Sequence, residues 1–323
     1  MHPALGARYA LCVGHPDCWT TLLTVGTPRC RSSLIVVPCN LFLLPFCTEG
    51  IDLESLLDFY DKLGSTMPHF SPFRSTTADV VRQAVIPLSR VGNGGLAYTD
   101  ALVLTSGTLS RQKPDCMVTH TWSGLFLHLV SAVVSDALGL NEYHQIASKI
   151  AQGKLRDVKS KLEANGVLHH QYWICCFCVN QHGSICHGVG PAPQDPAALA
   201  RWEQNRRDTA TGRLLSFCDC KQPKVLNDQP DLCELNKFHV MMLWLQQQNR
   251  AFRQLVAVDS DYTVFGRAWC VAELVAAHNA GMPQSVCLHS NRPLDLDAED
   301  FSIYEKLTHL SVANSLSSRP EDF

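Results

Sequence analysis

The stretch RAWCVAEL, residues 267–274, carries a carboxylate near the start of a predicted helix. Apolar residues recur at helical spacing and predict the stripe that packs on a core: Ala268, Val271, Ala272, Val275 and Ala276. Glu273 lies off this stripe and within the first turns, where the helix dipole favours its charged form by roughly 0.3–1 kcal/mol. Two interpretations stay open. Glu273 is either a solvated residue of a helix start or a carboxylate that takes part in chemistry.

A second group of chemically capable side chains ends the run DCMVTHTW, residues 115–122. The run predicts a short buried strand, with Thr119, His120, Thr121 and Trp122 at its carboxyl end. In a parallel sheet covered on both faces, that end borders the ligand crevice. Trp122 could stack there on a flat ligand ring, and His120 could bind a hydroxyl or a phosphate. Alternatively, His120 satisfies a local backbone group and Trp122 covers the rim of the core.

Soft metal ligands gather in one third of the chain, which has 15 cysteines in all. Four of the following five residues would complete a tetrahedral zinc site: His182, Cys186, Cys218, Cys220 and Cys233. A structural metal would explain how the long Cys-, Pro- and Gly-rich segment 183–232 stays folded. The spacing is not a standard Cys-x-x-Cys pair, so reduced thiols without a metal, or a disulfide, remain alternatives.

The elements that must position these residues alternate along the chain. We expect strands at 115–122, 171–181, 253–262 and 284–290, and helices at 124–139, 142–166 (two helices), 233–248 and 267–281. Such alternation predicts a parallel sheet with helices on both faces, interrupted by a largely irregular insertion at 183–232. Helical patterns at 51–64 and 75–90 predict an N-terminal helical segment, 51–114, before the α/β domain of 115–323. Residues 1–50 are an extension of uncertain structure.

Composition limits the class of partner. With 46% hydrophobic and 18% charged residues, and a net charge of −3, the chain has the make-up of a globular protein without the basic patches of a nucleic-acid binder. The apolar run at 32–47 is too short to span a bilayer and is interrupted by Pro38 and Pro45. It also lacks the pattern of a signal peptide. We therefore expect a cytoplasmic chain with reduced thiols and no membrane span.

Three of these motifs, in this order, resemble the TIR domain. The first strand, MVTHTW, is similar to the Ser/Thr-His-Ser/Asn-Trp-like end of the first TIR strand, and WCVAEL resembles the Trp-Cys-x-x-Glu-Leu start of a late TIR helix. The run WICCFCVNQ, residues 173–181, is similar to the Trp-Ile-Asp-x-x-Cys-Ile-Asn-Gln run of the TIR-related HET domain. The resemblance covers roughly residues 115–290.

The resemblance implies a flavodoxin-like, three-layer fold and an NAD-cleaving activity in which Glu273 is the essential carboxylate. NAD would be the substrate, bound beside Thr119, His120 and Trp122, and like domains would associate with one another. Trp269 and Cys270 would anchor the helix on the sheet. Two departures favour the alternative of a non-catalytic TIR/HET-like interaction module: Cys175 stands where many relatives carry an acidic residue, and the insertion replaces the loop that shapes the site.

Overall fold

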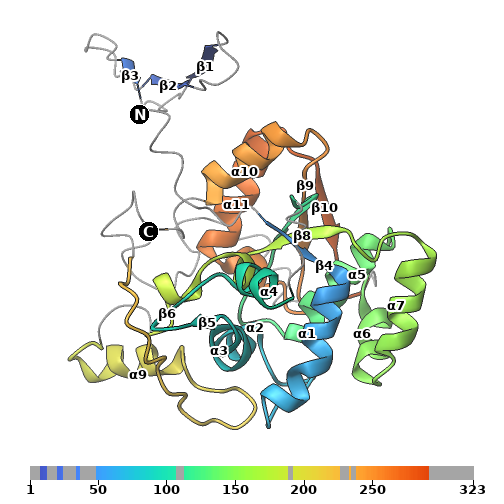
Figure 1. Ribbon diagram of the computed structural model, residues 1–323, viewed down its shortest axis with the longest axis vertical. Helices are drawn as coiled ribbons and strands as arrows, with labels where there is room; N and C mark the ends of the chain where they lie inside the picture. Colours follow the sequence, from blue (N-terminus) through green and yellow to red (C-terminus); the bar gives the residue numbers. More distant parts are fainter. Residues whose placement is uncertain are drawn as a thin grey trace, which may run out of the picture. The chain divides into compact units, whose positions relative to one another are not determined.

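Figure 1 shows the computed structural model of the chain, which describes residues 8–12, 20–24, 34–36, 49–106, 113–187, 192–225, 233 and 238–290. The chain divides into two compact units, Met1–Phe46 and Cys47–Phe323. In the first unit, three strands pair as an antiparallel sheet in the order β1 (Arg8–Cys12), β2 (Thr20–Thr24) and β3 (Leu34–Val36). Most of the expected extension 1–50 and the end of the expected α/β domain, 291–323, lie outside the described residues.

A five-stranded sheet is the centre of the second unit. Its strand order is β10 (Gln284–Cys287), β9 (Arg253–Ala257), β7 (Cys116–Thr119), β8 (Gln171–Ile174) and β4 (Ile51–Asp52). The first four run parallel to one another, and β4 pairs antiparallel with β8 at one edge. All residues of β7 and β8 are buried, as expected for a sheet covered on both faces. The sequence-based prediction of a parallel α/β sheet is confirmed for four of the five strands, whereas the antiparallel edge strand β4 was not predicted.

Hydrogen bonds from the sheet show which helix covers each face. On one face, Arg253 donates two hydrogen bonds to Asp136 of α5 (Phe126–Ala137), and the hydroxyl of Tyr172 donates to the same carboxylate. On the opposite face, Thr119 donates to Glu273 of α11 (Ala268–Asn279). Because successive side chains of a strand point to opposite faces, helices lie on both sides of the sheet. The arrangement is a three-layer α/β one.

The remaining helices extend these two layers. Helices α1 (Leu53–Thr66), α6 (His144–Ala151) and α7 (Leu155–Ala164) pack together beside α5 (Figure 1). Asp52 caps α1 by accepting a hydrogen bond from the Ser55 amide, which satisfies one free donor of the helix start.

Between α1 and β7 the chain forms α2 (Thr77–Val80), the π-helical turn η2 (Val81–Val85), α3 (Ile86–Leu88), the hairpin β5 (Arg90–Val91) and β6 (Gly94–Gly95), and α4 (Tyr98–Ser106). After β8 come α8 (Cys175–Cys178), the 3-10 turn η3 (Gln181–Gly183), α9 (Pro196–Gln204), α10 (Phe238–Gln248) and the 3-10 turn η5 (Thr263–Gly266).

Two local predictions were wrong. The expected strand at 171–181 stops at Ile174 and continues as α8, because the side-chain amide of Gln181 donates to the carbonyls of Cys175 and Val179 and so holds a turn. The expected apolar stripe of the last helix is not its buried face. Val275 is 49% exposed, whereas Cys270 and Ala277 are buried. The helix is therefore rotated from the predicted orientation, which brings Glu273 to the face that packs on the sheet.

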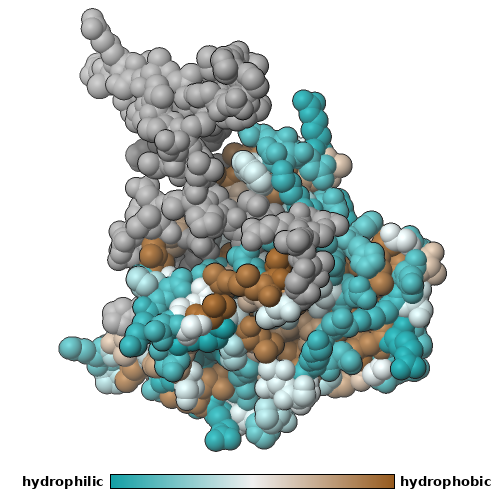
Figure 2. Space-filling model, viewed as in Figure 1, coloured by the Kyte–Doolittle hydropathy of each residue, from teal (hydrophilic) through white to brown (hydrophobic). Residues whose placement is uncertain are grey.

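The surface is mixed. Figure 2 shows hydrophilic residues around much of this face of the molecule and apolar residues gathered nearer its centre. Within the described residues, none of the helices combines the length and the apolar character needed to cross a membrane. The apolar mass lies inside, in a continuous core that includes Leu57, Val118, Phe126, Phe177 and Leu255.

Candidate functional site

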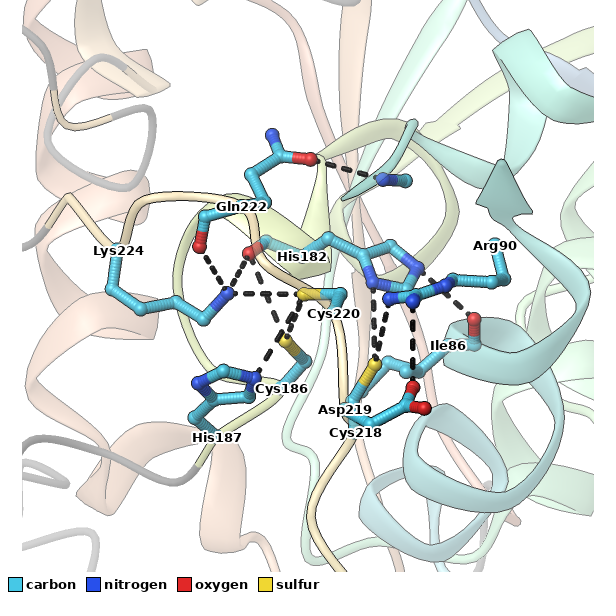
Figure 3. A network of polar contacts seen from close by, with 11 residues as sticks. Ile86, Arg90, His182, Cys186, His187, Cys218, Asp219, Cys220, Gln222 and Lys224 are labelled. Atoms are coloured by element: carbon cyan, nitrogen blue, oxygen red, sulfur yellow. Dashed lines mark hydrogen bonds and ion pairs between the residues drawn. The ribbon is translucent and has the colours of Figure 1, made fainter. Parts of the chain in front are cut away.

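Four of the five predicted metal ligands lie together. One ligand atom from each of His182, Cys186, Cys218 and Cys220 falls within 4.8 Å of the others (Figure 3). His182 belongs to η3, and Cys186 follows it by four residues, so both come from the end of the β8–α8 segment. Cys218 and Cys220 come from an irregular part of the insertion, and the amide of Cys218 donates to the carbonyl of Cys186. The cluster could hold a metal ion.

Cys233 is not part of this group. Its side chain is buried, but the four ligand atoms that the structure brings together belong to the other predicted residues. The prediction of a site drawn from five candidates therefore narrows to His182, Cys186, Cys218 and Cys220. The ten cysteines whose side chains the structure describes form no disulfide bond with one another.

The ring of His182 is held in one orientation. Its Nε2 lies 3.0 Å from the carbonyl oxygen of Ile86 and 3.1 Å from Oγ of Ser89, which leaves Nδ1 facing the Cys218 sulfur at 3.7 Å. Since the Ile86 carbonyl can only accept, Nε2 carries the proton and Nδ1 has a free lone pair. A backbone carbonyl that fixes the tautomer in this way is typical of histidines that ligate metals.

The hairpin β5–β6 makes room for this ring. A Cβ atom added to Gly95 would lie 2.0 Å from Cδ2 of His182, so no other residue fits there without displacing the imidazole. The carbonyl of Gly95 also accepts a hydrogen bond from the side chain of Asn180, whose Oδ1 in turn accepts from the His182 amide. Glycine in the hairpin and the asparagine cap together place the histidine.

Two of the distances between ligand atoms match tetrahedral coordination, and all of them lie within 4.8 Å. In a tetrahedron with zinc–sulfur bonds of ~2.3 Å and zinc–nitrogen bonds of ~2.0 Å, neighbouring ligand atoms are ~3.5–3.8 Å apart. The Cys186 and Cys220 sulfurs are 3.5 Å apart, and the Cys218 sulfur is 3.7 Å from Nδ1 of His182. Three thiolates and one imidazole are a soft ligand set that suits zinc.

Two cations lie beside the sulfurs. Lys224 donates to Cys220 at 3.2 Å, and Arg90 donates to Cys218 at 3.7 Å (Figure 3). Burial disfavours the thiolate of Cys220, but a backbone hydrogen bond from Gln222 and the Lys224 ammonium outweigh it and lower its pKa to about 7. Sequence reasoning missed both cations. Lys224 is only four residues beyond Cys220, and this proximity in the sequence was the available signal.

The carboxylate of Glu273, on α11, belongs to a second candidate site. Thr119, at the carboxyl end of β7, donates its hydroxyl proton to Oε2 of Glu273 at 2.6 Å. Burial raises the pKa of Glu273 to about 7, and the hydrogen bond from Thr119 opposes that rise. The residue as a whole keeps part of its surface exposed. The structure thus brings together Glu273 and Thr119, two of the predicted site residues.

Trp122 and Cys175 extend this second site. The indole N–H of Trp122 donates to the Cys175 sulfur at 3.4 Å. Burial, with the nearby charge of Glu273, raises the pKa of Cys175 to about 12, so this thiol is neutral near pH 7. Cys270 donates to the carbonyl of His120 and so ties α11 to the end of β7, whereas Trp269 is partly exposed and packs edge-on against Phe238 of α10.

His120 points to a separate small pocket. Its Nδ1 lies 3.3 Å from the carbonyl of Val118, and its Nε2 is buried without a hydrogen-bond partner among the described residues. Burial lowers the pKa of His120 to about 4, so the imidazole is neutral. The pocket beside it leaves 10 Å³ for the centre of a water molecule, which is room for about one water. Its lining includes Thr121 and Asp259 but not Glu273 or Trp122.

Comparisons with known proteins add no relative: no protein-family model, no curated protein and no solved structure matches the chain.

Proposed function

We propose that this chain is a TIR-like domain that cleaves NAD with Glu273 as the essential carboxylate. The observation that carries the proposal is the placement of Glu273 on the packed face of α11, with its carboxyl held at 2.6 Å by Thr119 from the end of β7. A solvated glutamate at a helix start would have no such partner. The fold assignment behind the proposal is a flavodoxin-like sheet of the TIR type.

The strand order supports that assignment. Numbered along the chain, the four parallel strands β7, β8, β9 and β10 lie in the order 2-1-3-4, since β8 and β9 flank β7. This is the order of flavodoxin-like sheets, in which ligands bind at the carboxyl ends of strands 1 and 3, where the order reverses. Here those strands are β7 and β9. Thr119 is the last residue of β7, and Glu273 lies on the helix that follows β9.

The chemistry of this site suits the cleavage of the bond between nicotinamide and ribose. Departure of nicotinamide leaves positive charge on the ribose, and a carboxylate fixed beside it stabilises that transition state more than the ground state. Water then forms a bond to the same ribose carbon and releases a proton, which yields ADP-ribose. The ionised form of Glu273 is the active one. Trp122 would stack on a ring of NAD, whereas His120 lines a separate pocket that includes neither Glu273 nor Trp122 and is left out of this site.

We also propose that the cluster of His182, Cys186, Cys218 and Cys220 binds a structural zinc ion. All four positions of a tetrahedron would be filled by the protein, which leaves no open position for a substrate. Zinc with three thiolates has a net charge of −1, and Lys224 and Arg90 lie where they offset it. The role of the metal would be to tie the insertion to the end of the β8–α8 segment.

Incubation of the purified chain with NAD, followed by chromatography for nicotinamide, tests the activity. We expect release by the parent protein and a loss of ~10²–10³-fold in Glu273→Gln, because this substitution removes the charge and keeps the size. A matched control is Glu203→Gln, a partly exposed glutamate of α9, which should cleave NAD like the parent. Cleavage retained in full by Glu273→Gln would refute the role of Glu273.

The neutral thiol of Cys175 beside Trp122 favours a second candidate. Cys175 stands where many TIR and HET domains carry an acidic residue, so the site lacks that second carboxylate. A cytoplasmic TIR/HET-like module that self-associates and does not turn over NAD needs no such carboxylate. The two candidates differ in solution. The module predicts concentration-dependent self-association in light scattering with no nicotinamide release, also at concentrations where the chain is assembled.

A further inference from the structure

A chain of hydrogen bonds crosses three strands and ends at Glu273. Gln284 of β10 donates to Oε1 of Gln254 at 2.7 Å, Gln254 of β9 donates to Thr119 at 2.7 Å, and Thr119 donates to Glu273. The parallel register pairs Gln284 with Gln254, so their side chains lie on the same face of the sheet. Gln254 and Thr119 are fully buried. Two buried polar side chains between strands would cost stability unless they were paired as they are here.

The donor-to-acceptor direction of these hydrogen bonds is fixed at Gln284, the end farthest from Glu273. Nε2 of Gln284 also donates to the carbonyl oxygen of Leu274, at 3.1 Å. A carbonyl can only accept, so the amide of Gln284 cannot turn its oxygen toward Leu274 without repulsion. Its N–H therefore faces Oε1 of Gln254, which leaves Nε2 of Gln254 for Thr119. The hydroxyl of Thr119 then accepts from Gln254, and its one proton is directed to Glu273.

We propose that Gln254 and Gln284 are positioning residues, which orient the Thr119 hydroxyl so that it donates to Glu273 and holds the carboxylate in place for the reaction. This inference rests on the proposed function of Glu273. Oε2 is the oxygen engaged by Thr119, while Oε1 makes no hydrogen bond with the described residues and is left for the substrate. The backbone of α11 contributes through Leu274, the residue that follows Glu273, so the helix and the carboxylate are oriented together.

Few other titratable groups face Glu273 within the described residues. They are Cys175 of α8 and Cys270 of its own helix, and burial raises the pKa of both thiols well above the physiological range. Both are therefore neutral and leave the charge of Glu273 unbalanced. Arg267, at the start of α11, and Asp259, after β9, act on Cys270 with opposite signs. The hydrogen bond from Thr119 is thus the polar contact that favours the ionised form of Glu273.

The test reverses the direction of the hydrogen bonds between Gln254, Thr119 and Glu273 by an isosteric substitution. In Gln254→Glu an ionised side chain can only accept from Thr119, so the hydroxyl proton turns away from Glu273. A protonated side chain would still donate to Thr119, so Gln254→Met is the deciding variant. Gln254→Met keeps the shape and removes both hydrogen bonds, which leaves Thr119 free to rotate. We expect the pKa of Glu273 to rise by about 1–2 units in Gln254→Glu and by less in Gln254→Met, since one hydrogen bond to a charged group is lost. Infrared difference spectra against Glu273→Gln assign the carboxyl band and follow its titration.

A second pair of variants, at Thr119, tests the same proposal if the Gln254 variants do not fold. Thr119→Ser keeps the hydroxyl and should titrate like the parent, whereas Thr119→Val is isosteric and should raise the pKa of Glu273 as Gln254→Glu does. Where NAD is cleaved, kcat should fall ~10–100-fold in Thr119→Val and Gln254→Glu with KM little changed, and the alkaline shift should appear in the pH profile.

The two proposals can fail separately. If Gln254→Met and Thr119→Val fold and titrate like the parent, the positioning role is wrong even though the parent cleaves NAD. If the parent releases no nicotinamide but the carboxyl band shifts as expected, the hydrogen-bond chain orients Glu273 and the proposed function is wrong.

Discussion

Gly95→Ala is the sharpest perturbation of the candidate metal site. The added Cβ would lie 2.0, 2.3 and 2.4 Å from three atoms of the His182 ring, whereas ordinary contacts of this kind begin near 3.4 Å. The ring must therefore move by more than 1 Å, and this displaces Nδ1 from the three sulfurs. It also breaks the hydrogen bonds of Nε2 with Ile86 and Ser89. Because Gly95 has an ordinary negative φ, alanine itself causes no backbone strain.

The expected loss of stability in Gly95→Ala has two parts. Overpacking of a filled interior costs about 1–3 kcal/mol, and the loss of two hydrogen bonds costs about 0.5–1.5 kcal/mol each. We expect the free energy of unfolding to fall by roughly 2–6 kcal/mol, measured by urea denaturation, and zinc to be lost or to exchange rapidly with a chelator. Gly94→Ala is the matched control, since its Cβ would meet only the flexible end of Gln222, at 3.0 Å. If Gly95→Ala binds one zinc per chain and unfolds at the same urea concentration as the parent, the placement of His182 is wrong.

Three further predictions follow from the same structure. Glu273→Gln should flatten the pH dependence of stability. Burial raises the pKa of Glu273 in the folded protein to about 7, above the ~4.3 of an unfolded chain, so the parent protein loses stability as the pH rises between these two values. The urea midpoints at pH 4 and pH 8 should therefore differ less in the variant than in the parent. Asp136→Asn should lower the free energy of unfolding by about 3 kcal/mol, because it leaves Arg253 without its bidentate partner. If the free energy of unfolding falls by less than about 1 kcal/mol, the ion pair does not contribute as we expect. Trp269→Ala should lower the free energy of unfolding by less than the ~3–5 kcal/mol expected for a fully buried tryptophan, because its side chain is partly exposed and its ring contact is Phe238. Phe252→Ala removes a fully buried aromatic ring, and its melting temperature should fall further than that of Trp269→Ala.

The sequence predicted elements whose signals are local. The two helices α6 and α7 were expected within 142–166. The expected helix ranges 124–139 and 142–166 end at Gly139 and Gly166, and both glycines have a positive φ just after α5 and α7. The edge strand β4 was missed because two residues before a helix carry no pattern of their own; Ile51 becomes a strand residue only by pairing with Tyr172. The orientation of α11 was also beyond local reasoning, since its apolar residues are spread around the helix.

The candidate sites show the same division. Residue type and rough clustering were enough to name His182, Cys186, Cys218 and Cys220, because thiols and imidazoles carry their chemistry with them. The groups that orient them were not predictable: the Ile86 carbonyl and Gly95 are 96 and 87 residues before His182, and neither residue has a chemistry that suggests a metal site. The partner of Glu273 was named, but for a different reason. Thr119 was expected to face a ligand, and in the structure its hydroxyl donates to the carboxylate itself.

The segment from Cys175 to His182 joins the two sites. At one end, the Cys175 sulfur accepts from Trp122 and is close enough for the charge of Glu273 to raise its pKa. At the other end, His182 is a candidate metal ligand, and between them the Gln181 amide binds three carbonyls of the same segment. A metal that holds His182 in place would therefore also hold Cys175, through a short and internally bonded turn. For this reason the metal cluster and the carboxylate site are expected to depend on one another, so that loss of the metal disturbs the surroundings of Glu273 from the far end of this segment.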